Sequence, residues 1–197
     1  MNSLQRAWLT FVHRRKFASL GKRPQFPIPL LQVEGHVEMG DFCRFRNNVT
    51  LRTHGDGKII FGNRSGCSWG CMIEAASEIR IGNYTAIAEY SVVSDVVMPL
   101  MGNDAAPKDT PRRGIPITIG NDCFIGNGCY IGPGATIGDG AVIAHNSIVL
   151  REVGDLEIWA GAPARRVGHR TENVPAAKLA EYERLVAQQG IQEIRYD

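Results

Sequence analysis

The sequence contains no apolar run of the roughly 18 residues that a membrane-spanning helix needs. It has no secretory signal peptide either, because its first apolar stretch, residues 7–12, is short and is followed by charged residues. Its 22 Lys and Arg nearly balance its 20 Asp and Glu, and a net charge of +2 implies no polyanionic partner. These absences argue against a membrane-embedded, secreted or nucleic-acid-binding protein.

Histidine and cysteine are scarce. The five His have no zinc-ligand spacing, and none lies within residues 94–116. The five Cys occupy inward positions of the repeat described next, so we expect small core residues and not disulfide partners or metal ligands. The spacing of Cys67 and Cys71 leaves a metal pair as an alternative. Buried free thiols and the absence of a targeting signal predict a cytoplasmic protein. The spacing of the His and Cys residues predicts that it holds no metal.

The chain does contain a six-residue repeat. An aliphatic residue recurs at every sixth position, and a small residue follows four positions after each of the first five. The aliphatic positions are Ile119, Ile125, Ile131, Ile137, Ile143 and Val149, and the small ones are Cys123, Cys129, Ala135, Ala141 and Ser147. Such periodicity is typical of a parallel β-helix, in which each short strand stacks on the strand one coil below.

The same pattern extends toward the N-terminus, with steps of ten and eight residues at two places. Its aliphatic or aromatic positions are Val33, Met39, Phe45, Leu51, Phe61, Ile73, Ile81, Ile87 and Val93, with Cys67 also in phase. The pattern predicts one all-β solenoid over residues 33–150. Residues 94–116 interrupt it as a long loop, which four Pro and two Gly make irregular.

The two ends are expected to be helical. Residues 1–32 comprise a basic amphipathic helix at 3–20 and a Pro-rich linker at 23–30. We expect the helix to cap the open end of the solenoid, with contact to an anionic membrane surface or a carrier protein as the alternative. Residues 151–197 are a C-terminal segment with a helix at 175–189, which packs on the solenoid or on a neighbouring subunit.

The stretch IGNDCFIGNGCYIGPGATIGDGAVIAHNSIV at 119–149 and AGAPAR at 160–165 resemble the hexapeptide-repeat acyltransferases. The nearest likeness is to their galactoside, maltose and xenobiotic acetyltransferase branch, over roughly residues 33–168. The resemblance implies a left-handed parallel β-helix with three strands per coil and a homotrimer with active sites between subunits. It also implies acetyl-CoA or another acyl-CoA as donor, and a hydroxyl or amine of a sugar or small molecule as acceptor.

In that family a His at the start of the long loop acts as general base. A gap-free alignment puts this position at Met98, whose thioether cannot accept a proton. The family's supporting acid falls at Ala75, with Glu74 beside it. The residues expected to bind the acceptor are Ser68, Trp69, Asp95, Met98 and Arg113.

The repeat itself locates replacement bases. Residues 51, 73 and 93 should stack one coil apart, and each is followed by an insertion at the same corner. His54, in a Gly-flanked loop, and Glu74 therefore leave from the corner that carries Met98. Both are candidate bases, although His54 could be an exposed turn residue, and Glu74 would need its pKa raised by burial. His145, at another corner, is a third candidate that could act across the trimer or simply form a wall.

Donor binding is expected in the last coils. Arg151 replaces a family Lys, and Arg165 and Arg166 follow a Gly-Ala-Pro-Ala turn, so these cations could meet the CoA phosphates or could be ordinary surface charge. Phe124 stands where the family has a Trp. Gly126 and Ala144 leave room for a pantetheine arm, though tight packing also explains them.

The sequence therefore predicts a CoA-dependent acyltransferase with a non-standard base. Its alternative is a catalytically inactive trimeric scaffold that binds CoA, a sugar or a protein. A β-helix carbonic anhydrase is excluded because the His residues lack the spacing of zinc ligands.

Overall fold

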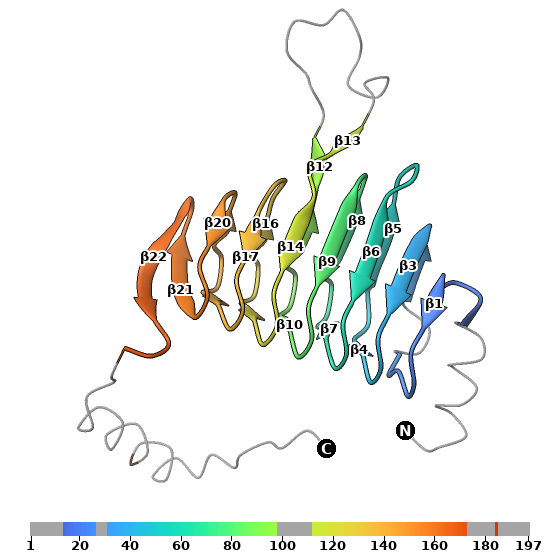
Figure 1. The fold of residues 1–197 in the computed structure, drawn as a ribbon. Helices are drawn as coiled ribbons and strands as arrows, with labels where there is room; N and C mark the ends of the chain where they lie inside the picture. The colour runs from blue at the N-terminus through green and yellow to red at the C-terminus, as the bar shows by residue number, and fades with distance from the viewer. Residues whose placement is uncertain (1–13, 27–30, 98–111, 173–183, 185–197) are drawn as a thin grey trace, which may run out of the picture.

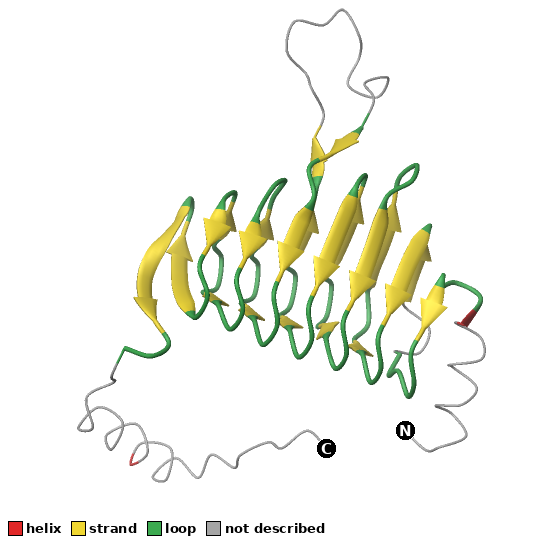
Figure 2. Ribbon diagram, viewed as in Figure 1, coloured by secondary structure: helices red, strands yellow, loops and turns green. Residues whose placement is uncertain are grey.

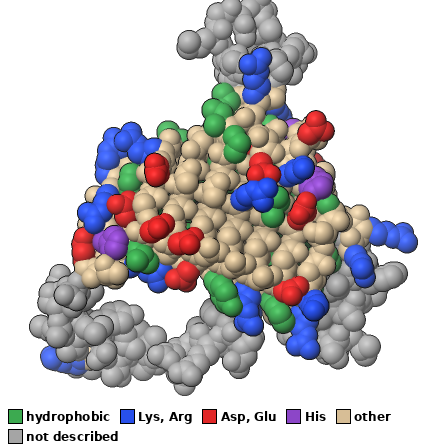
Figure 3. Space-filling view, in the orientation of Figure 1, with side chains coloured by type: hydrophobic (Ala, Val, Ile, Leu, Met, Phe, Trp, Pro, Cys, Tyr) green, Lys and Arg blue, Asp and Glu red, His purple; other side chains and the backbone are tan. Residues whose placement is uncertain are grey.

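The computed structural model describes residues 14–26, 31–97, 112–172 and 184. Over these ranges the chain winds into a parallel β-solenoid, with three sheets along its length (Figure 1). Strands and turns alternate almost throughout, as Figure 2 shows. Acidic and basic side chains are interspersed on the face in Figure 3. In these ranges no helix is long and apolar enough to span a bilayer.

Each coil contributes one strand to each sheet. The first sheet has the spatial order β1 (Ser19–Leu20), β3 (His36–Met39), β6 (Lys58–Phe61), β9 (Glu78–Ile81), β14 (Ile117–Ile119), β17 (Thr136–Ile137) and β20 (Glu152–Val153). The second has β22 (Ala164–His169), β21 (Glu157–Gly161), β18 (Val142–Ile143), β15 (Phe124–Ile125), β10 (Ala86–Ile87), β7 (Gly66–Cys67) and β4 (Arg44–Phe45). The third has β19 (Ile148–Val149), β16 (Tyr130–Ile131), β11 (Val92–Ser94), β8 (Met72–Ala75), β5 (Val49–Thr53) and β2 (Leu31–Glu34).

The anchors of the repeat stack in columns inside the solenoid. Ile119 lies opposite Ile81 in the first sheet, and Ile73 lies between Leu51 and Val93 in the third. All five side chains are buried. The predicted hexapeptide solenoid and the stacking of residues 51, 73 and 93 are therefore confirmed.

The strands extend beyond residues 33–150. Ser19–Leu20 pairs in parallel with β3, so the helix expected at 3–20 does not reach its predicted end. Residues 3–13 lie outside the described ranges, and Arg14 is helical. Phe17 and Phe26 stack at a centroid distance of 5.4 Å, and Phe26 stacks on Phe45, so aromatic rings close this end of the core.

At the other end, β20, β21 and β22 continue the first and second sheets to His169. The last two of these strands form an antiparallel pair. Of the helix predicted at 175–189, only Arg184 is described, and it is helical. The predicted irregular loop 94–116 begins and ends in an antiparallel ribbon of β12 (Val96–Val97) and β13 (Arg113–Gly114).

All five cysteines are buried and free, as the repeat predicted. The Cys43 thiol donates to the carbonyl oxygen of Gly62 at 3.1 Å. Burial raises the pKa of Cys43 to about 11, so this thiol stays protonated at neutral pH. The cysteines therefore serve as small core residues.

Replacement of Ile125 by Val should lower the free energy of unfolding by about 0.5–1.5 kcal/mol, because it removes one methylene from a fully packed column. Urea unfolding measures this value. Ile148→Val is the matched control, since Ile148 is 36% exposed and should change stability far less. Equal losses for the two variants would mean that the column is not the core.

Candidate functional site

His54 and Glu74 meet at the corner between the third and first sheets. His54 opens the turn after β5, and Glu74 lies in β8 one coil further along. His54 Nε2 is 2.7 Å from Glu74 Oε1, and the side chains are 24% and 17% exposed. The stacking of residues 51 and 73 thus joins two residues that the sequence offered as separate candidates.

Arg112 completes this group from the returning arm of the long excursion. Its Nη1 atom is 2.8 Å from His54 Nε2 and 3.3 Å from His54 Nδ1, and it lies 3.6 Å from Glu74 Oε1. Nε2 can either donate to Glu74 or accept from Arg112; with the ring proton on Nε2, His54 donates to Glu74 and only the longer contact of Arg112, to Nδ1, can be a hydrogen bond. A carboxylate that fixes one ring nitrogen leaves the other as a proton acceptor, which is the arrangement of a general base.

A line of alternating charge approaches this corner along the third sheet. Arg52 lies in register with Glu34 on one side and Glu74 on the other. The Arg52 Nε atom donates to Glu34 Oε2 at 2.8 Å, and this hydrogen bond and charge hold the pKa of Glu34 below its usual range. Arg52 therefore places positive charge one coil from Glu74.

Asp95 holds the base of the excursion in place. Its side chain is fully buried, and its two carboxylate oxygens accept the backbone N–H groups of Ala76 and Ser77 at 2.6 and 2.9 Å. Burial raises the pKa of Asp95, the backbone hydrogen bonds oppose this, and the charge of Glu74 adds to it. The predicted contact of Asp95 with an acceptor stays a prediction. Met98, at the position of the family His, lies outside the described residues.

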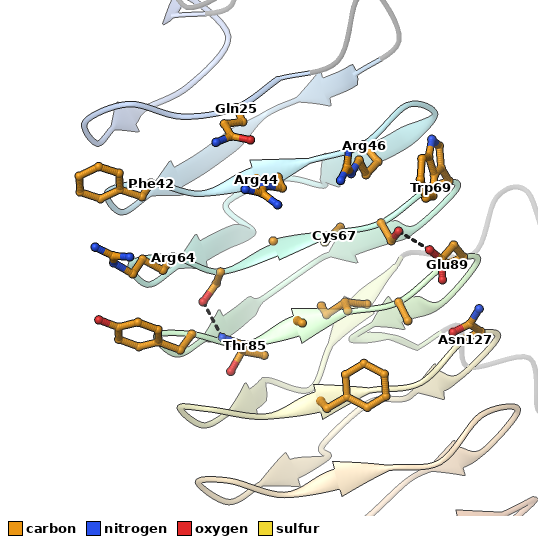
Figure 4. A pocket seen from close by; sticks show the side chains of 18 residues that line it. Gln25, Phe42, Arg44, Arg46, Arg64, Cys67, Trp69, Thr85, Glu89 and Asn127 are labelled. Carbon is orange, nitrogen blue, oxygen red and sulfur yellow. Dashed lines mark hydrogen bonds between the residues drawn. The ribbon is translucent and has the colours of Figure 1, made fainter. Parts of the chain in front are cut away.

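Ser68, Trp69 and Phe124 line a hollow on the outer face of the second sheet, with a volume of about 610 Å³ (Figure 4). The Ser68 hydroxyl donates to Glu89 Oε1 at 2.6 Å, and this hydrogen bond lowers the pKa of Glu89. We call this hollow the groove. His54 lies at the corner between the third and first sheets, so the second sheet is on the opposite side of the solenoid.

His145 packs edge-on against Phe124, with ring centroids 6.3 Å apart. Its Nδ1 atom accepts the backbone N–H of Asn127 at 2.9 Å. With Nδ1 accepting this hydrogen bond, a neutral ring carries its proton on Nε2. The role of His145 as a base stays a prediction.

The donor candidates have different surroundings. Arg151 and Arg113 are exposed, and Arg165 donates to the carbonyl oxygen of Ala164 at 2.8 Å. Arg166 forms ion pairs with Glu157 and Glu172, both at 3.1 Å.

Gly126 has no room for a Cβ, which would lie 2.7 Å from the backbone nitrogen of His145. Coil packing therefore accounts for this glycine. Ala144, in the next coil, donates its backbone N–H to the carbonyl oxygen of Trp159.

Sequence reasoning missed Arg112 as a partner of His54, because its position depends on the path of the excursion. It also missed three arginines that line the groove: Arg44, Arg46 and Arg64. Within the described ranges, no cluster of three or more His, Cys, Asp or Glu side chains is arranged to hold a metal ion.

Residues 116–151 match the family model of bacterial transferase hexapeptide (six repeats). The six-residue repeat predicted from the sequence is thus matched by a known repeat family over this segment. The match lies over β14 to β19, where the six-residue columns are uninterrupted. No curated protein matches the chain.

The solenoid is also similar to solved acyltransferase structures. The N-acyltransferase AntD from Bacillus cereus, in complex with dTDP and 3-hydroxybutyryl-CoA, is 17% identical, covers 93% of this chain and 97% of its own, and has a TM-score of 0.72. The hexapeptide-repeat acetyltransferase VCA0836 from Vibrio cholerae O1 biovar eltor, complexed with acetyl coenzyme A, is 22% identical, with coverages of 87% and 81% and a TM-score of 0.63. The polySia-specific acetyltransferase NeuO is 17% identical, with coverages of 89% and 99% and a TM-score of 0.54. At these identities the likeness is one of fold.

Proposed function

We propose that this protein is a CoA-dependent acyltransferase that acylates a hydroxyl or amine of a sugar or small metabolite. The observation that carries the proposal is the 2.7 Å contact between His54 and Glu74 at the foot of the excursion. The fold likeness supports it, because AntD is an N-acyltransferase and VCA0836 is an acetyltransferase, with structures containing 3-hydroxybutyryl-CoA and acetyl coenzyme A, respectively.

In the proposed reaction, the acceptor O–H or N–H gives its proton to Nδ1 of His54. The acceptor oxygen or nitrogen attacks the thioester carbonyl carbon, a C–O or C–N bond forms, and the C–S bond breaks. The imidazolium returns the proton to the leaving sulfur, so that CoA departs as the thiol. Glu74 balances the positive charge of the ring, and Arg112 lies where it can face the developing oxyanion once the acceptor has displaced it from Nδ1.

Donor binding is assigned to the last coils. Arg151 and Arg165 are exposed cations suited to the CoA phosphates, whereas Arg166 is committed to two glutamates in the protomer and would have to release them. The proposed assembly is a homotrimer. Because the groove and the His54 corner face away from each other in one chain, a neighbouring protomer would bring its His54 corner to the groove.

The test is release of free CoA thiol from acetyl-CoA by the full-length protein, over a panel of amino sugars, sugar nucleotides and hydroxylated metabolites. Acceptor-dependent release, with the acylated product identified by mass spectrometry, supports the proposal. Binding of acetyl-CoA without turnover on any acceptor would refute it in favour of the inactive trimeric scaffold.

A further inference from the structure

The floor of the groove is a row of outward-facing residues in which two small residues lie between an arginine and a phenylalanine. Arg44, Gly66, Ala86 and Phe124 follow one another in register across β4, β7, β10 and β15. A Cβ on Gly66 would collide with the carbonyl oxygen of Arg44, so this position is restricted to glycine. The result is a flat strip with an arginine at one end and a half-exposed phenylalanine ring at the other. Three strand spacings make it roughly 14 Å long, close to the length of a nucleoside diphosphate.

Two further arginines lie along the rims of this strip, each stacked on an aromatic ring (Figure 4). The Arg46 guanidinium carbon is 5.2 Å from the Trp69 ring centroid, and that of Arg64 is 5.0 Å from the Phe42 centroid. A guanidinium that stacks by its face keeps its N–H edge for an anion, and this edge matches the oxygens of a phosphate. The rings therefore hold the arginines in a conformation suited to binding phosphate.

The backbone of one rim is unusual. Phe42, Arg64 and Tyr84 have φ values of 60°, 56° and 56°, in the left-handed region that bulky side chains rarely adopt. The same turn continues beyond the groove with Asp122, Gly140 and Leu156, whose φ values are 52°, 68° and 57°. The left-handed backbone therefore belongs to this turn along the solenoid, and within the groove it presents Phe42, Arg64 and Tyr84 at the rim.

We propose that the groove binds a nucleoside diphosphate, with its phosphates on Arg44, Arg46 and Arg64 and its base on the ring of Phe124. Glu89, held by Ser68 at the far rim, accepts hydrogen bonds from ribose hydroxyls and keeps the phosphates at the arginine end. The proposal that the groove binds a nucleoside diphosphate is argued from the groove residues alone. The further statement that this ligand is the activated form of a sugar acceptor rests on the proposed acyltransfer.

Titration calorimetry with UDP tests the proposal on the full-length protein. UDP should bind at one site per chain, and Arg46→Ala with Arg64→Asn should weaken binding by about 10- to 100-fold, since each arginine removed loses charge-assisted hydrogen bonds. Asparagine at position 64 tolerates the left-handed backbone, so the double variant should keep its fold, which circular dichroism checks. Arg80→Ala is the matched control, because Arg80 is an exposed arginine on the first sheet, paired with Glu78.

Uridine and inorganic pyrophosphate should each bind more weakly than UDP, because each supplies half of the contacts. The absence of UDP binding to the wild type, or equal binding to the double variant, would overturn the assignment. So would displacement of UDP by CoA in direct competition, because the groove would then be the donor site. Thiol release with acceptors that carry no nucleotide, together with a groove that fails to bind UDP, would leave the acyltransferase function standing and reject this inference alone.

Discussion

His54→Ala is expected to lower kcat for acyl transfer by about 10²- to 10⁴-fold, the usual contribution of a positioned general base. The reason is geometric: Glu74 contacts Nε2 at 2.7 Å, which leaves Nδ1, 3.3 Å from Arg112, as the proposed proton acceptor. Steady-state thiol release, with product identified by mass spectrometry, measures the effect. KM for the donor should change little, because the proposed donor residues, Arg151 and Arg165, lie in later coils.

The chain supplies a matched control in a second His–Glu pair. His36 Nε2 also lies 2.7 Å from a glutamate oxygen, that of Glu38, but this pair is more exposed, at 41% and 38%, and has no contact with Arg112. His36→Ala should therefore retain wild-type kcat. Unchanged turnover in His54→Ala, or the same loss in both variants, would remove His54 from the mechanism.

Asp95→Ala is expected to lower the free energy of unfolding by about 2–6 kcal/mol. Two partly buried backbone N–H groups, of Ala76 and Ser77, lose their acceptors, and each donor left unsatisfied costs about 1–3 kcal/mol. Urea unfolding measures the loss. Asp56→Ala, which removes an exposed carboxylate from the neighbouring turn, should stay within about 0.5 kcal/mol of wild type.

The pH dependence follows from the raised pKa of Asp95. The folded state holds this proton more tightly than the unfolded state, so the stabilisation is complete below the unfolded pKa. The contribution of Asp95 to the free energy of unfolding falls as pH rises from its unfolded-state pKa to its higher folded-state pKa, and it stays constant at higher pH. The difference in stability between wild type and Asp95→Ala should therefore shrink as pH rises above about 4. A difference that grows over this range would contradict burial as the dominant influence on the pKa of Asp95.

The period of the repeat was enough to predict both the fold and part of the candidate site. A six-residue step with three strands per coil fixes which residues stack, and the column of Leu51, Ile73 and Val93 follows directly from it. Because the corners of the coils stack as well, the sequence also predicted that His54 and Glu74 leave from one corner.

Features set by tertiary packing escaped prediction. Ser19–Leu20 carries no hexapeptide signal, and it becomes a strand because β3 offers a free edge and the rings of Phe17 and Phe26 cover the core. The burial of Asp95 depends on the turn at 76–77, one coil away in space. No local pattern in the sequence encodes either contact.

The three groove arginines escaped prediction for a related reason. Only the stacked coils show that Arg44, Arg46 and Arg64 surround one strip of small residues, since the arginines come from two coils and the strip extends over further ones.

The central claim is that His54 and Glu74 act as one catalytic unit, and a double-mutant cycle on kcat tests it most directly. Glu74→Gln alone should lower kcat, while His54→Ala with Glu74→Gln should be no slower than His54→Ala alone, because the carboxylate acts only through the ring. Additive losses, with the double variant slower by the product of the two single effects, would contradict the account and give Glu74 a role of its own.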